Sequence, residues 1–128
     1  MPTYTFETRP DGQFSAVVQR VRDALASEGF GVLTEIDVQS TLKTKLDVDM
    51  APYLILGACN PPLAHQAIEA DPNIGALLPC NVVVREDGDG VVVSFMDPAA
   101  VLGLVDAAGV HDIAAQVRDK LMRVRDSL

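Results

Sequence analysis

The chain has 128 residues, a formal net charge of −8 and an apolar content of 48%, which is typical of a folded globular protein and excludes a disordered acidic tail. We expect one domain over residues 1–128, large enough to fold without a disulfide or a metal. The acidic charge and the ten scattered basic residues argue against nucleic acid and membrane surfaces as partners. No secretory signal pattern and no run of ~20 apolar residues occurs, so we expect a cytoplasmic protein.

The N-terminal sequence predicts a strand followed by a helix. Tyr4 and Phe6 alternate with polar residues, which predicts a half-buried strand over residues 1–8. Asp11 is placed to cap the helix, and Gly29 is placed to end it. The apolar residues of this helix recur at spacings of three and four: Phe14, Val17, Val18, Val21 and Leu25.

The middle of the chain predicts two further strands and two short helices. Residues 32–38 are predicted to form a strand that is partly buried on both faces. Residues 40–50 favour a short helix, with a mobile loop or an extended edge segment as alternatives. The apolar run 53–59 predicts a central strand. Asn60 then occupies the N-cap position of a helix over 61–70, with proline at its first position.

The last third predicts a β-hairpin and two helices. Two β-branched runs, 80–86 and 91–96, flank an Asp-Gly turn, so we expect them to pair antiparallel. An Asp-Pro pair opens a helix through about residue 107, and a longer amphipathic helix is predicted over 110–126. The apolar stripe of this last helix is regular: Val110, Ile113, Ala114, Val117, Leu121 and Val124.

This order of elements predicts an α+β fold. We expect a two-layer sandwich of the β-α-β(4)-α type with extra short helices, in which a mainly antiparallel sheet of about five strands carries its helices on one face. The runs 53–59 and 82–84 read as buried on both sides. A homodimer that packs sheet against sheet would cover the second face.

The sequence contains no P-loop, dinucleotide fingerprint or nucleophile elbow. One other group of residues could carry chemistry. Its members are Cys59, Asn60, His65, Cys80 and Asn81. Cys59 precedes a predicted helix N-terminus, where the helix dipole and free N–H groups lower a thiol pKa and attract anions. The leading hypothesis is therefore a dimeric protein that binds a small ligand, a small anion among them, or a protein partner at this strand-helix corner.

Two alternatives remain open for the same corner. Cys59 or Cys80 could serve a thiol-dependent enzyme or a redox protein. Cys59, His65 and Cys80 could instead bind a metal, although only three ligands are visible and their spacing matches no familiar zinc pattern. The sequence itself does not identify a cofactor.

Four segments of the chain resemble the domain-of-unknown-function family numbered 302. They are residues 57–64, 71–72, 77–84 and 96–98. The resemblance implies a small α+β domain with a TATA-binding-protein-like arrangement, often dimeric, and no established activity, substrate or cofactor. Asn60, Pro61, Pro79 and Cys80 match the family's pattern. DNA binding is not expected from the shared fold, since a fold does not fix function and the charge here is acidic.

Overall fold

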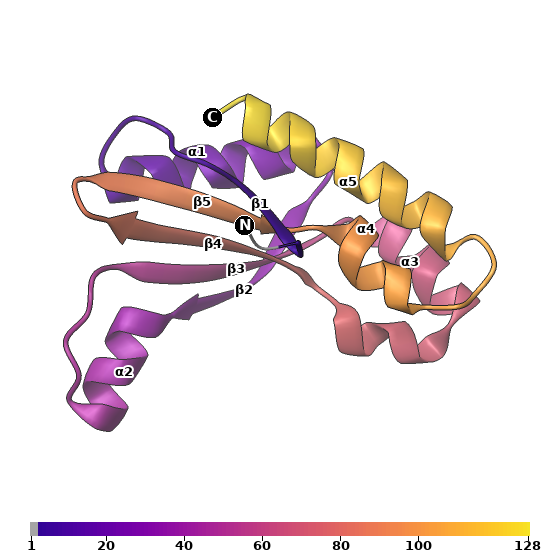
Figure 1. Ribbon diagram of the computed structural model, residues 1–128, viewed down its shortest axis with the longest axis horizontal. Coiled ribbons are helices and arrows are strands. Elements are labelled where there is room, and N and C mark those ends of the chain that lie inside the picture. The colour runs from indigo at the N-terminus through magenta and orange to yellow at the C-terminus, as the bar shows by residue number, and fades with distance from the viewer. Residues whose placement is uncertain (1–2) are drawn as a thin grey trace.

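Five antiparallel strands form one sheet in the computed structural model, which describes residues 3–128 (Figure 1). The strands are β1 (Thr5–Thr8), β2 (Gly31–Asp37), β3 (Tyr53–Cys59), β4 (Cys80–Asp87) and β5 (Gly90–Met96). Their spatial order is β1-β5-β4-β3-β2, and every neighbouring pair is antiparallel. The predicted α+β class and the antiparallel hairpin are confirmed. The first two residues of the strand predicted over 1–8 lie outside the described part of the chain.

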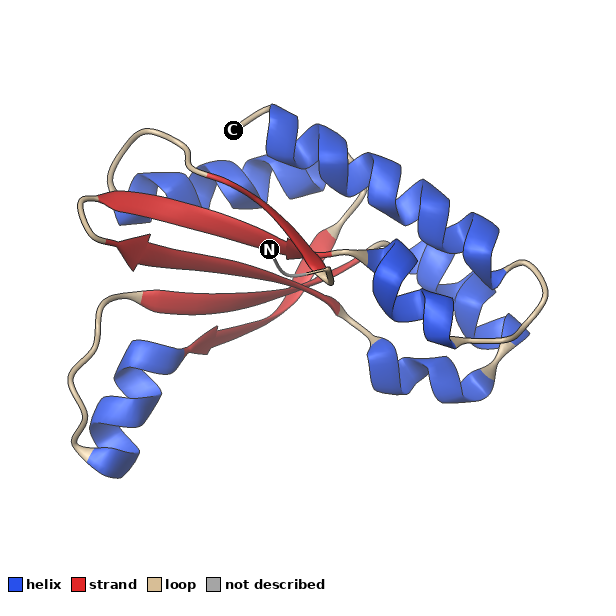
Figure 2. Ribbon diagram, in the orientation of Figure 1, coloured by secondary structure: helices blue, strands red, loops and turns tan. Residues whose placement is uncertain are grey.

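Two long helices lie side by side on the same face of this sheet (Figure 2). They are α1 (Phe14–Ser27) and α5 (Val110–Asp126). Shorter elements gather at one end of the sheet: α3 (Pro61–Ala70), α4 (Pro98–Val101) and the 3₁₀ helices η1 (Pro72–Leu77) and η2 (Leu102–Leu104). The remaining helix, α2 (Val38–Leu46), stands apart at the other end and buries no residue.

The core fills the layer between the sheet and the two long helices. Alternate residues of the inner strands point into it, Leu56 on β3 and Val82 on β4 among them, and both are fully buried. All six apolar residues predicted as the stripe of the last helix are buried on α5, which confirms that prediction. Each buried valine, leucine or isoleucine of this layer contributes roughly 1.5–3 kcal/mol on burial.

The opposite face of the sheet is buried only in part, at Val92 of β5, and not along the central strands as the sequence suggested. Ile55 and Val83 point to this face and are only half-buried, because neither long helix lies over it. The strand β2 is exposed along nearly its whole length, with Val32 half-buried. The expectation that it is partly buried on both faces is wrong, since β2 is an edge strand. We call this uncovered side the open face.

Local sequence signals located the ends of some helices but not of others. Asp11 does not cap α1, whose N-cap is Gln13; the main-chain carbonyl of Asp11 instead accepts a hydrogen bond of 2.7 Å from Arg20. The ambiguous segment after β2 is helical, as favoured, and Asp37 caps it by accepting from the Ser40 N–H. The helix predicted through residue 107 breaks up much earlier, into α4 and η2.

Candidate functional site

Asn60 lies at the corner where β3 ends and α3 begins. Its side-chain oxygen accepts a hydrogen bond of 3.3 Å from the Leu63 N–H, as predicted for an N-cap. Its side-chain nitrogen donates to the main-chain carbonyl of Glu28, the C-cap residue of α1, at 3.5 Å. Asn60 is buried, at 9% exposure, so both ends of the amide are used within the protein.

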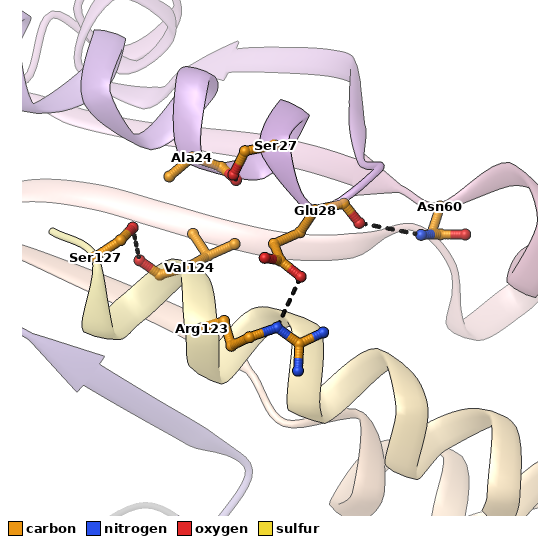
Figure 3. A network of polar contacts seen from close by, with 7 residues as sticks. All are labelled: Ala24, Ser27, Glu28, Asn60, Arg123, Val124 and Ser127. Atoms are coloured by element: carbon orange, nitrogen blue, oxygen red, sulfur yellow. Dashed lines mark hydrogen bonds and ion pairs between the residues drawn. The ribbon is translucent and has the colours of Figure 1, made fainter.

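The same corner is tied to the last helix through Glu28 (Figure 3). The Glu28 carboxylate accepts a hydrogen bond of 2.9 Å from Nε of Arg123 on α5. Asn60, Glu28 and Arg123 therefore join the start of α3, the end of α1 and the last turn of α5. Asn60 therefore has a structural role in this arrangement. The sequence indicated its N-cap position but not its contact with Glu28, because the two residues are 32 positions apart in the chain.

Replacing Asn60 with alanine is expected to lower the free energy of unfolding by about 2 kcal/mol, since a cap is lost and a carbonyl loses its donor. Asn60→Asp should lose less, because it keeps the capping oxygen. Urea denaturation measures both variants, with Asn73→Ala on an exposed residue as control. An Asn60→Ala protein as stable as the wild type would contradict this role.

The first turn of α3 offers no free N–H group to an anion. Pro61 and Pro62 occupy its first two positions and have no N–H to donate. The Leu63 N–H bonds to the Asn60 side chain, and the Ala64 N–H bonds to the Asn60 carbonyl at 2.9 Å. The donors on which the expected anion site depends are therefore either absent or already used.

The two cysteines do not form an activated pair. Cys80 lies opposite Ala58 in the β3–β4 register and is buried, whereas Cys59, the next residue of β3, is half-buried and lies on the other strand face. Both are free thiols. Burial raises the pKa of Cys59, and it raises the pKa of Cys80 to about 11, with the nearby Cys59 adding to the rise. This is the reverse of the shift that the helix N-terminus was expected to cause, and it disfavours a thiolate nucleophile.

The raised pKa of Cys80 makes a contribution to stability that depends on pH. Below about pH 9 the thiol is protonated in both folded and unfolded chains, and the contribution is fully present. Between about pH 9 and about pH 11 only the unfolded chain releases the proton, so the folded state loses up to about 3 kcal/mol. Urea denaturation at the two ends of this range measures the free energy of unfolding of the wild type and of Cys80→Ala. Between the lower and the higher pH, this free energy should fall more in the wild type than in the variant. Equal losses would contradict this linkage.

The other two candidates lie away from the cysteines. His65 is 73% exposed on α3, where its Nε2 lies 3.0 Å from a carboxylate oxygen of Glu69. Asn81 is exposed on the open face, opposite Gly57. The metal site suggested for Cys59, His65 and Cys80 is not assembled, because His65 lies apart from the two cysteines. Within residues 3–128 no group of three His, Cys, Asp or Glu side chains is placed to hold a metal ion.

A small apolar pocket does lie at this corner. It sits between the ends of β3 and β4 and the helices α3, η2 and α5, and its volume is about 30 Å³. Three of the five predicted site residues line it, namely Cys59, Asn60 and Cys80. The rest of its wall is Phe30, Ala58, Leu63, Ala64, Ala67, Leu78, Pro79, Leu102, Ile113 and Val117. The residues from η2 and α5 were missed at this site, because sequence periodicity marks them only as core.

Comparison with known proteins agrees with the resemblance drawn from the sequence. The family model "Domain of unknown function DUF302" matches residues 4–128. The chain belongs to the DUF302 family. It is also similar to the structure described as "Crystal structure of uncharacterized conserved protein DUF302 from Bacillus stearothermophilus", with a TM-score of 0.90 and 25% sequence identity over 98% of each chain.

The family assignment fixes the fold of this DUF302 domain and leaves its activity open. No curated protein matches the sequence. No helix in residues 3–128 is both long and apolar enough to cross a membrane. Any function must therefore be argued from the corner pocket and from the surfaces of the domain.

Proposed function

We propose that this DUF302 domain is a binding protein whose small-molecule site is the corner pocket. The observation that carries the proposal is that an apolar pocket opens between half-buried Cys59, Ala64, Leu78 and Pro79, beside the N-cap residue Asn60. Ligand sites are commonly concave, largely apolar and already formed before the ligand binds; at about 30 Å³ this pocket is far smaller than the ~300–1,000 Å³ of a drug-sized site, so it admits only a small part of a ligand. A catalytic thiol is the weaker candidate, because burial raises the pKa of both cysteines.

The test is a screen of small compounds of varied chemistry by two-dimensional amide NMR on the full chain. A ligand of the pocket should shift the amide signals of Leu63, Ala67 and Val117 in a saturable way. Ala64→Leu should abolish these shifts, because Ala64 lies on the rim and the larger side chain fills the opening. Ala70→Leu, on an exposed position of the same helix, is the matched control. If no compound of any class shifts the pocket signals, the proposal fails.

We further propose that the domain acts as a homodimer through the open face. Ile36, Ile55 and Val83 lie opposite one another in neighbouring strands and form an apolar row there. Ile36 is 48% exposed, and the row lies outside the layer covered by α1 and α5. A second copy of the same face would remove this row from water.

Light scattering tests the dimer at micromolar concentration. We expect a mass of twice the 13.7 kDa of one chain, and Ile55→Lys should shift it toward the monomer. Ile68→Lys, at an exposed position on α3, is the matched control and should stay dimeric. A wild-type mass near 13.7 kDa would reject the proposal.

A further inference from the structure

The chemistry of the ligand follows from the side chains that line the corner pocket, so this inference rests on the proposed function. None of the lining side chains carries a formal charge. The two cysteines among them stay protonated at neutral pH, since burial raises the pKa of both. The wall therefore favours an uncharged group over an anion or a cation.

The pocket also offers little hydrogen bonding. The Asn60 amide already bonds to Leu63 and Glu28. The N–H groups at the start of α3 are missing or used, as shown above for Pro61 and Pro62. A polar group that entered would lose its hydrogen bonds to water without replacing them, which would weaken its binding. The part of the ligand inside the pocket should therefore be hydrocarbon.

The size of the pocket limits the shape of that hydrocarbon. Its volume of about 30 Å³ is far below the ~150 Å³ of an engineered apolar cavity that holds benzene. A ring would have to displace buried side chains such as Ile113 or Val117, which are 7% and 6% exposed. The end of an unbranched chain has the smallest cross-section among aliphatic groups and fits with the least displacement.

We propose that the pocket binds the terminal segment of an unbranched aliphatic chain, with the remainder of the ligand held outside the rim. The rim consists of half-buried residues, Cys59, Ala64, Leu78 and Pro79, so the chain enters between β3, the start of β4 and α3. Each methylene group removed from water should tighten binding by about fourfold.

The experiment compares two alcohols of similar hydrophobicity, n-hexanol and cyclohexylmethanol, by amide NMR titration of the full chain. We expect n-hexanol to shift the signals of Leu63, Ala67 and Val117 in a saturable way. Its affinity should exceed that of cyclohexylmethanol by about tenfold or more. This comparison is made on the wild type, so it does not depend on a variant that folds poorly.

Two variants then locate the binding. Ala64→Leu should lower the affinity for n-hexanol by about tenfold or more, whereas Ala70→Leu should leave this affinity unchanged. Equal affinity for the ring and the chain, or pocket shifts caused only by polar or charged compounds of the screen, would overturn the inference and leave the proposed site standing. Absence of pocket shifts with every compound, n-hexanol included, would overturn both.

Discussion

Replacing Phe95 with alanine is expected to lower the free energy of unfolding by about 3–5 kcal/mol, the largest effect of any single substitution considered for this domain. Phe95 is fully buried on β5 and stacks on Phe6 of β1, with ring centroids 5.4 Å apart. Truncation removes the transfer free energy of the ring and leaves a cavity. It also removes the aromatic stacking contact between β5 and the short edge strand β1.

Urea denaturation, followed by far-ultraviolet circular dichroism, measures this loss. Tyr4→Ala is the matched control, because Tyr4 is an aromatic residue near the same edge strand but is 61% exposed. Its effect should stay within about 0.5 kcal/mol. If Phe95→Ala and Tyr4→Ala changed the stability equally, the packing described for β1 and β5 would be wrong.

The second large effect is expected for Gly57→Ala, which should destabilise the fold by about 3 kcal/mol. A Cβ atom at this position would come within 2.8 Å of Cγ of Pro79 and would overlap the Thr34 hydroxyl. The Thr34 side chain can rotate away, but the proline ring is closed and has little room to move. The cost therefore arises from the close packing of three chain segments on the open face, next to the Pro79 rim of the corner pocket.

A double variant separates the two clashes. Gly57→Ala combined with Thr34→Ala should recover only part of the lost stability, since the contact with Pro79 remains. Gly103→Ala is the control for the loss of glycine itself, because no atom lies within 4 Å of a Cβ built there. A Gly57→Ala protein with wild-type stability, or full recovery in the double variant, would contradict the proposed role of Pro79.

The local parts of the candidate site could be predicted from the sequence. Asn60 followed by proline indicates an N-cap in any context, because the cap and the fixed φ of proline act over three or four residues. The strand 53–59 and the stripe on α5 were predicted correctly for the same reason, since periodicity reports which face of an element is apolar.

The convergence of side chains could not be predicted in this way. Cys59 and Cys80 both line the corner pocket, but the β3–β4 register, which pairs Cys80 with Ala58, places the two cysteines on opposite strand faces. His65 was expected to join them, but the rotation of α3 about its axis turns it toward Glu69 and solvent. The expected drop in thiol pKa failed because the surroundings are apolar, and only packing reveals that.

Length, apolar content and a charge of −8 determined by themselves that this chain folds, and local patterns determined its α+β class and most of its elements. These properties depend on composition and on residues close together in the chain. Only the tertiary structure decided that β2 is an exposed edge, that one sheet face is uncovered, and that η2 and α5 complete a pocket beside Cys59. Those features depend on contacts between distant segments, and no local pattern specifies which segments will meet.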